Sequence, residues 1–203
     1  MRRSELVRAL EKVPGPATPR AEWEQVVTPP ERAADLLEAT STEGGLVGRS
    51  VADLGSGTGR LAIGAALLGA GPVLGIEQDL ELVHVAAQAA HELGVVVEFH
   101  PGDVTTFAGS VDYVVMNPPF GAQRKGADRP FWDVAFGTAR RAIFAFALAE
   151  SRTFIARRAV AASAHIVASR PVPWELPRTF ALHSHRRVSL DVDLWTLRTQ
   201  KEP

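Results

Sequence analysis

The sequence contains no cysteine, and this absence removes several kinds of chemistry at once. Its 203 residues can form no disulfide, offer no thiolate to a metal and hold no cysteine nucleophile. No run of about 18 apolar residues is present, so a transmembrane helix is not expected. The N-terminus also lacks the apolar core of a signal peptide. We therefore expect a cytoplasmic protein without a membrane segment.

Charge of either sign is nearly balanced, at a formal net charge of −1, but it is unevenly spread. Between Val51 and Phe120 there is one basic residue against eight acids. Between Arg140 and Arg187 there are nine arginines against two acids. Such a basic region can bind a polyanion, and it can equally be a solvated face.

Apolar segments typical of strands alternate along the chain with segments typical of helices. This order predicts βαβ units and a mainly parallel sheet, in one domain that spans residues 1–203. We expect residues 1–45 to form N-terminal helices and a lid, with Thr28 capping the second helix, and residues 46–198 to form the core. The final segment, 188–197, alternates between apolar and polar residues and predicts a half-exposed strand.

A glycine-rich turn follows the first expected strand. The segment DLGSGTG places Gly55, Gly57 and Gly59 after Asp53, and glycine permits a positive φ and close approach of a ligand. The spacing differs from the GxGxxG of dinucleotide-binding proteins. It therefore favours S-adenosylmethionine (SAM), which has no phosphate, over NAD.

Acidic residues follow the next two expected strands. Glu77 lies where a carboxylate can accept the hydroxyls of a ribose, and Asp103, next to Val104, where an acid can accept an adenine amino group. Because the carboxyl ends of parallel strands meet at one edge, these residues should lie together around one ligand.

The fourth expected strand ends in the tetrapeptide Asn117-Pro118-Pro119-Phe120. Two prolines cannot continue a central strand, so they indicate a rigid exit from the sheet. The Asn117 side-chain oxygen and the Pro118 carbonyl can accept the two N–H groups of a planar amine or amide. Phe120 can stack on a flat base. This pattern predicts methyl transfer to such a nitrogen.

The motifs DLGSGTG and NPPFG resemble those of class I SAM-dependent N-methyltransferases. Together with WEQVVTPPERAADLL, VDYVVMNPPFGAQRKGADRPF and HSHRRVSLDVDL, they resemble the small-subunit ribosomal RNA adenine-N6 methyltransferase family of archaea and eukaryotes. The resemblance implies a Rossmann-like seven-stranded sheet with an antiparallel last strand and helices on both faces. It also implies RNA as substrate and a small zinc-binding activator as partner.

The resemblance implies a role for each matching position. Gln25 and Thr28 match a cofactor lid, Asn117 to Phe120 match the catalytic tetrapeptide, and the remaining cofactor-binding residues are Asp53, Gly55, Gly57, Thr58, Gly59, Arg60, Glu77, Asp103, Val104 and Asn117 itself. We expect Arg124, Lys125, Arg186 and Arg187 to contact RNA phosphates. No His, Asp and Glu cluster has metal-ligand spacing, so no metal is expected.

One segment departs from the family pattern. Where the family has a polar, basic stretch after the fifth strand, this chain has Phe144-Ala145-Phe146-Ala147-Leu148. Two other functions stay open. A glutamine side chain in a protein also has a planar amide that fits NPPF, and the altered segment leaves open a SAM-binding subunit without catalysis.

Overall fold

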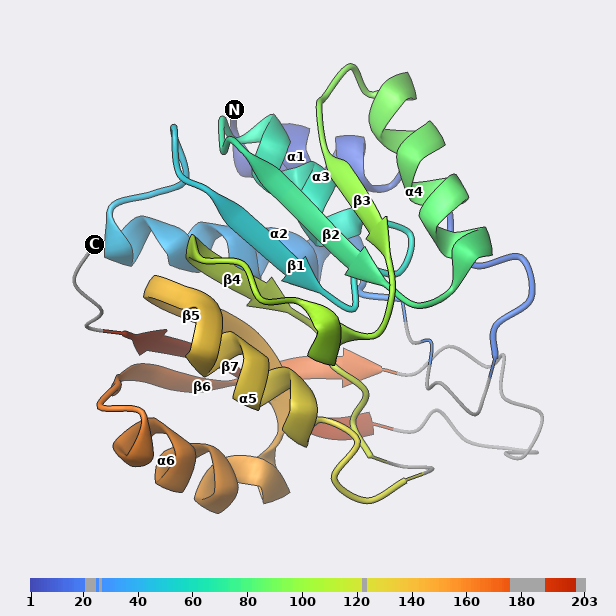
Figure 1. The fold of residues 1–203 in the computed structure, drawn as a ribbon. Coiled ribbons are helices and arrows are strands. Elements are labelled where there is room, and N and C mark those ends of the chain that lie inside the picture. Colours follow the sequence, from blue (N-terminus) through green and yellow to red (C-terminus); the bar gives the residue numbers. More distant parts are fainter. Residues whose placement is uncertain (21–24, 26, 122–123, 176–188, 200–203) are drawn as a thin grey trace.

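The fold is built on a single seven-stranded sheet (Figure 1). The structure is a computed structural model that describes residues 1–20, 25, 27–121, 124–175 and 189–199. Its strands are β1 (Val51–Leu54), β2 (Val73–Glu77), β3 (Glu98–Pro101), β4 (Val111–Met116), β5 (Ala139–Leu148), β6 (His165–Glu175) and β7 (Ser189–Arg198).

The strand order is β3-β2-β1-β4-β5-β7-β6. Strands β1 to β5 pair in parallel, and β7 runs antiparallel to both β5 and β6. The predicted fold class, a mainly parallel seven-stranded sheet with an antiparallel last strand, is confirmed. The order reverses between β1 and β4, and in open α/β sheets ligands bind beyond the carboxyl ends of the strands at such a point.

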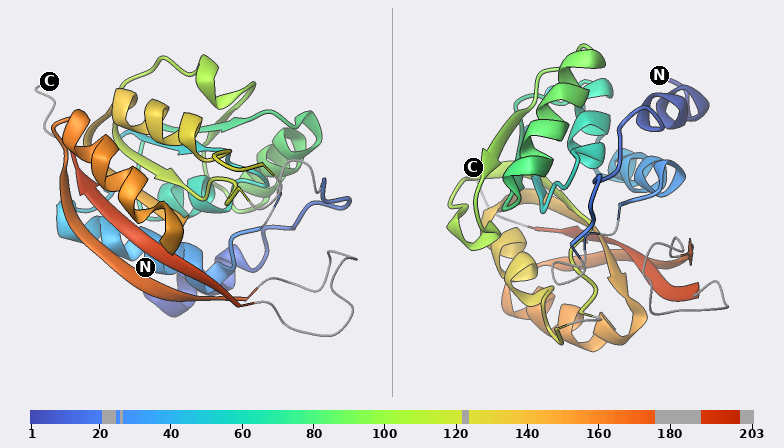
Figure 2. Two further views of the ribbon diagram at one scale, coloured as in Figure 1. Left: turned by 90° about the horizontal axis from the view of Figure 1, so that it is seen from below. Right: turned by 90° about the vertical axis from the view of Figure 1, so that its right-hand side faces the viewer.

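Helices cover both faces of the sheet (Figures 1 and 2). They are α1 (Arg3–Leu10), α2 (Pro30–Ala39), α3 (Arg60–Leu67), α4 (Leu80–Glu92), α5 (Arg129–Thr138) and α6 (Arg152–Ala161), with short 3-10 turns η2 (Thr40–Glu43), η3 (Val104–Thr106) and η4 (Ala149–Ser151). Alternate residues of β4 pack on opposite faces of the sheet. Tyr113 packs in the core with α1, α2 and α3, and Val114 packs in the core with α5 and α6.

The last strand differs from its prediction. Strand β7 was expected to be half-exposed, but its residues from Val192 to Leu197 are all buried. The reason is its position, because β7 lies between β5 and β6 and has covered faces on both sides. Leu194 packs in the core with α1–α3, and Trp195 packs in the core with α5 and α6. In the part of the chain that the structure describes, no helix is long and apolar enough to cross a membrane.

Close contact between α3 and the N-terminal helices depends on Gly64. A Cβ atom at Gly64 would clash with Leu37 of α2 and lie 3.3 Å from Leu10 of α1. Both leucines are fully buried, so they have little room to move.

We expect Gly64→Ala to destabilise the protein by about 1–3 kcal/mol, because overpacking outweighs the better helix propensity of alanine. Gly137→Ala in α5 is the matched control, since a Cβ there meets no atom within 4 Å. The control should be neutral or stabilising by up to about 1 kcal/mol. Chemical denaturation of both variants measures the difference, and equal effects would contradict the packing argument.

Candidate active site

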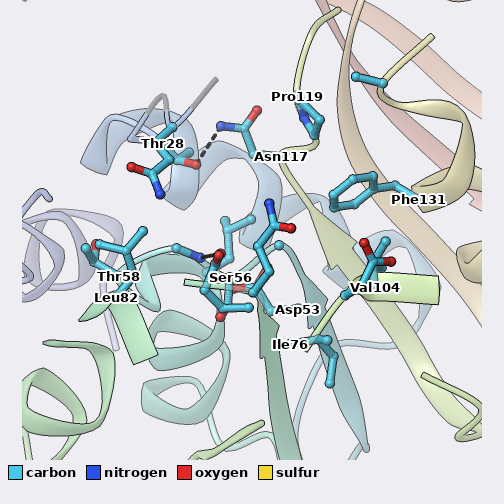
Figure 3. A pocket seen from close by; sticks show the side chains of 18 of the residues that line it. Thr28, Asp53, Ser56, Thr58, Ile76, Leu82, Val104, Asn117, Pro119 and Phe131 are labelled. Carbon is cyan, nitrogen blue, oxygen red and sulfur yellow. Dashed lines mark hydrogen bonds between the residues drawn. The ribbon is translucent and has the colours of Figure 1, made fainter. Parts of the chain in front are cut away.

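A cavity of about 440 Å³ opens at the carboxyl ends of β1, β2 and β4 (Figure 3). This size is within the usual range for small-molecule sites, roughly 300–1,000 Å³. The residues predicted from the sequence that line it are Gln25, Thr28, Asp53, Gly55, Gly57, Thr58, Arg60, Glu77, Asp103, Val104, Asn117, Pro119 and Arg124. Strand ends that are far apart in the sequence thus contribute to one site.

The glycine loop after β1 has the backbone shape that its composition predicts. Gly55, Gly57 and Gly59 have φ values of +71°, +54° and +84°. A Cβ at Gly55 would also lie 2.8 Å from the ring of Phe131, and one at Gly59 would lie 2.7 Å from the ring of Phe99. Gly59 does not line the cavity itself. It allows the loop to enter α3 beneath Phe99.

Most amide N–H groups of this loop are already bonded within the protein. Those of Gly55 and Ser56 donate to the Ile76 carbonyl at 2.9 and 3.0 Å. That of Gly59 donates to the Ser56 carbonyl at 2.8 Å, and that of Gly57 donates to the Glu77 carboxylate at 2.8 Å. Because these four N–H groups already have acceptors within the protein, they are not available to bind the pyrophosphate of a dinucleotide.

Glu77 connects the loops that follow β1 and β2. One carboxylate oxygen accepts the Gly57 N–H, and the other accepts the Asp79 N–H at 2.9 Å. Burial raises the pKa of Glu77, and these two N–H donors act in the opposite direction. A carboxylate has about four acceptor sites, so Glu77 can still accept hydroxyl groups of a ligand.

Asp53 is a buried acid on the cavity wall, only 1% exposed. Its Oδ2 accepts the Ala62 N–H at 3.0 Å, and its Oδ1 has no hydrogen-bond partner within the described residues. Burial, and more weakly the nearby charge of Glu77, raises the pKa of Asp53 to about 7. This carboxyl is therefore ready to ionise when a cation enters the cavity.

Asp103 stands at the start of η3, on another wall of the cavity. Its side chain accepts from both the N–H and the hydroxyl of Thr105, at 2.8 and 2.6 Å. These bonds lower the pKa of Asp103, which therefore stays ionised and held in one orientation. Val104 beside it is buried and supplies an apolar surface.

An N-terminal segment borders the cavity. Gln25 donates to Asp79 at 2.9 Å and accepts the Arg20 N–H at 2.8 Å. Arg60 donates to the Thr28 carbonyl at 2.6 Å, and its other terminal nitrogen donates to the Val13 carbonyl. Val13 and Thr28 are thus bound to α3, and Gln25 is bound to the start of α4.

Thr28 does not cap α2, so this expectation was wrong. The residue at the cap position is Pro29, and no side chain bonds to the first turn. The Thr28 hydroxyl instead accepts a hydrogen bond of 3.0 Å from the Asn117 side-chain nitrogen (Figure 3). Proline at the first helical position has no N–H to satisfy, which reduces the need for a cap.

The NPPF tetrapeptide begins directly after β4 ends at Met116. Asn117 and Pro119 line the cavity, whereas Pro118 is buried and Phe120 is half-buried outside the lining. The Phe120 ring packs edge-on against Trp174 of β6, with 5.5 Å between ring centroids. Trp174 thus supports the tetrapeptide from the side of β6.

The departure at residues 144–148 is explained by this aromatic packing. Phe146 contacts Trp174 with a centroid distance of 4.9 Å, and Ala147 is buried. The end of β5 therefore packs beneath Phe120 as apolar core, in place of a polar surface.

The predicted phosphate-binding residues have different outcomes. Arg124 lines the cavity, and Lys125 is exposed next to it without lining it. Arg186 and Arg187 lie outside the described residues.

Comparison with known proteins identifies the family. The model of the methyltransferase small domain matches residues 32–143. The rRNA N(6)-adenosine-methyltransferase Mettl5 of Drosophila melanogaster is 30% identical over 92% of this chain and 91% of its own. Protein MJ0284 of Methanocaldococcus jannaschii is 40% identical over 58% of each chain. PH1948 of Pyrococcus horikoshii, described as a candidate RNA methyltransferase, has a TM-score of 0.89 at 37% identity over 98% of each chain.

The chain belongs to the methyltransferase small domain family. The predicted resemblance to the rRNA adenine-N6 methyltransferases is confirmed by Mettl5. The protein is thus a class I methyltransferase that uses SAM.

The cavity of this methyltransferase fits SAM on chemical grounds. SAM carries a sulfonium and an ammonium, and Asp53, Glu77 and Asp103 give the cavity acidic walls. The buried Asp53 Oδ1 and Ser56 hydroxyl have no partner among the described residues and are open to a polar ligand. Four amide N–H groups of the loop already donate within the protein, so they cannot bind a phosphate. This supports SAM over NAD as the cofactor.

Sequence reasoning missed several residues that line the cavity of the methyltransferase. These are Pro16, Val27, Ser56, Leu61, Ile76, Gln78, Leu82, Gly102, Thr105, Ala127, Pro130 and Phe131. Ser56 stands inside the glycine motif and could have been found there. Phe131 is in the first turn of α5 and lies over Gly55, a contact with no signal in the sequence. Within the described ranges, no three His, Asp or Glu side chains cluster as metal ligands.

The raised pKa of Asp53 predicts a pH dependence of stability. Between its unfolded value of 3.8 and its folded value of about 7, the folded protein holds a proton that the unfolded chain releases. This contribution to stability is present below pH 3.8 and is lost as the pH rises through 7. The free energy of unfolding of the wild type, relative to Asp53→Asn, should therefore fall across this range by at most about 1.4 kcal/mol per pH unit.

The same carboxyl should release its proton when SAM binds near pH 6, because the cationic cofactor favours ionised Asp53. Calorimetry in two buffers of different ionisation enthalpy measures this proton. A release equal in wild type and Asp53→Asn would rule Asp53 out as the source.

Proposed function

We propose that the protein transfers the methyl group of SAM to the exocyclic N6 of an adenine in structured RNA, with ribosomal RNA as the first candidate. The observation that carries the proposal is the position of the NPPF tetrapeptide. Asn117 and Pro119 line the same cavity as the cofactor-binding acids, so a nitrogen held by the tetrapeptide lies next to the cofactor.

The chemistry of the target explains the residue types. The lone pair of an adenine N6 is delocalised into the ring, which makes it a poor nucleophile. The Asn117 Oδ1 and the Pro118 carbonyl would each accept a hydrogen bond from one of its two N–H groups. These two bonds would draw the nitrogen toward tetrahedral geometry. SAM supplies an electrophilic methyl group. No strong base is needed, because the nitrogen becomes acidic once it is methylated.

The aromatic contacts support binding of a flat base. Phe120 is half-buried and is backed by Trp174, which in turn is backed by Phe146. A ring supported in this way can stack on an adenine at little entropic cost, because it is already ordered. Such a base must leave its own stack to reach the cavity.

Two observations favour RNA over a protein substrate. The relative Mettl5 is named an rRNA N(6)-adenosine-methyltransferase, and the neighbour PH1948 is described as a candidate RNA methyltransferase. Arg124 lies on the cavity wall, and the exposed Lys125 follows it at the mouth. We propose that both contact phosphates.

A partner subunit is part of the proposal. The resemblance implies a small zinc-binding activator that adds a strand to the sheet. The sheet has two edges, β3 and β6. Strand β6 contains Pro171 and Pro173 within its length, and neither can donate to a new strand. The proline of β3, Pro101, is its last residue, so the rest of that strand can pair. We therefore propose the β3 edge for this contact.

Nucleoside mass spectrometry tests the function. RNA from cells that lack the gene should lose one N6-methyladenosine site, which the wild-type gene restores. The Asn117→Ala variant should not restore it, because we expect its turnover to fall about a hundredfold while SAM affinity stays nearly unchanged. Unchanged RNA, together with loss of a methylglutamine from a protein, would establish the protein substrate instead.

A salt titration tests the RNA contacts. Replacement of Arg124 and Lys125 by alanine should weaken binding of all RNA sequences alike and should reduce the slope of log affinity against log salt, because fewer counterions are released. Arg141→Ala is the matched control, since Arg141 is exposed near the start of β5, at the opposite end of the strand from the site. Slopes that are identical in all three proteins would remove these two residues from the RNA interface.

A further inference from the structure

A side-chain hydrogen bond joins the catalytic tetrapeptide to the N-terminal segment. The Asn117 amide nitrogen donates to the Thr28 hydroxyl at 3.0 Å, across 89 residues of sequence (Figure 3). Thr28 is only 7% exposed, so this bond is largely shielded from water. Its strength and geometry are therefore less disturbed by solvent than those of a surface bond.

Thr28 is itself held in place through its backbone. The Arg60 guanidinium donates to the Thr28 carbonyl at 2.6 Å and also to the Val13 carbonyl. Pro29 and Pro30 follow directly and lead into α2, so the backbone after Thr28 has little freedom. The hydroxyl that meets Asn117 is consequently a fixed acceptor.

The orientation of the Asn117 amide matters because its two ends have opposite hydrogen-bonding character. Its nitrogen only donates, and its oxygen only accepts. An adenine N6 presents two N–H donors, so a flipped amide would place donor against donor. Because the nitrogen donates to Thr28, the nitrogen end of the amide faces the N-terminal segment and the oxygen end is turned away from Thr28.

We propose that Thr28 is a positioning residue for catalysis, in addition to a wall of the cofactor site. Held by Arg60, its hydroxyl fixes the Asn117 amide with the oxygen directed toward the reactive nitrogen. This inference rests on the proposed function, because it requires that the target is a planar nitrogen. Adenine N6 and a glutamine amide both meet that requirement.

The arrangement also makes catalysis depend on the N-terminal segment. Gln25, three residues before Thr28, is bound to Asp79 at the start of α4. The Asn117 amide is therefore aligned only when this segment lies in place beside the cofactor cavity. The cavity wall formed by Gln25 and Thr28 and the alignment of the catalytic amide are thus parts of one arrangement.

Two substitutions at Thr28 separate the hydroxyl from the rest of the side chain. Thr28→Val keeps the shape but removes the acceptor, and we expect kcat to fall about tenfold to a hundredfold with the dissociation constant of SAM changed less than about twofold. Thr28→Ser keeps the hydroxyl and should restore kcat to within a few-fold of wild type. Steady-state kinetics and calorimetry with SAM measure these quantities.

A matched control accounts for the general loss of a buried hydroxyl. Thr40 is 2% exposed, and its hydroxyl donates to the Leu37 carbonyl at 2.6 Å, at the end of α2. Thr40→Val should lower stability without a specific fall in kcat of the folded protein.

A second measurement does not require turnover. Nuclear magnetic resonance of the Asn117 side-chain NH₂ should show faster proton exchange in Thr28→Val than in wild type or Thr28→Ser. Weakened SAM binding with unchanged kcat in Thr28→Val would overturn the proposal and leave Thr28 as a cofactor contact. So would unchanged NH₂ exchange, or an equal loss of kcat in the serine variant.

Failure of the RNA proposal is a separate result. If the wild type methylates a glutamine in a protein, the same three variants are compared on that substrate. If it methylates neither substrate, the proposed function fails, and the NH₂ exchange still decides whether Thr28 orients Asn117.

Discussion

The carboxylate of Glu77 joins the two loops on which the cofactor site is built. By accepting the N–H groups of Gly57 and Asp79, it fixes the turn after β1 against the turn after β2. The amides of Gly55, Ser56 and Gly59 donate to nearby carbonyls, so the backbone of the loop is ordered before any ligand binds. A preorganised cavity binds its ligand without a further ordering cost. These internal hydrogen bonds also influence which ligand can bind. An acidic cavity with few available N–H donors binds a cation better than a phosphate.

The catalytic tetrapeptide is supported from two directions by residues that are distant in sequence. On the side of the N-terminal segment, Thr28 meets Asn117, and Arg60 holds Thr28. On the side of β6, Trp174 meets Phe120. The prolines between Asn117 and Phe120 restrict the backbone. The contacts with Thr28 and Trp174 orient the side chains of Asn117 and Phe120. A planar target nitrogen needs both kinds of order, because acceptor geometry and base stacking must be correct at the same time.

The altered segment at the end of β5 packs in the core beside the catalytic loop. Phe144 and Phe146 are fully buried, and Phe146 packs against Trp174 directly beneath the support of Phe120. Where the family pattern has a polar, basic stretch, these residues strengthen the core next to the catalytic loop. In the proposed function, RNA phosphates therefore bind at the cavity mouth. Arg124 lies on the cavity wall there, and Lys125 is exposed.

Local chain chemistry determined a large part of this protein from the sequence alone. The positive φ of Gly55, Gly57 and Gly59, the end of β4 before the prolines, and the alternation of strands and helices all follow from stereochemistry and periodicity within short segments. The meeting of these motifs at one sheet edge followed from parallel topology. Only the tertiary structure decided that Thr28 bonds to Asn117 and does not cap α2, that Phe131 lies over Gly55, and that β7 is buried on both faces. Each of these depends on which distant segments come together, and such pairings are set by packing of the whole core, which no short stretch of sequence contains.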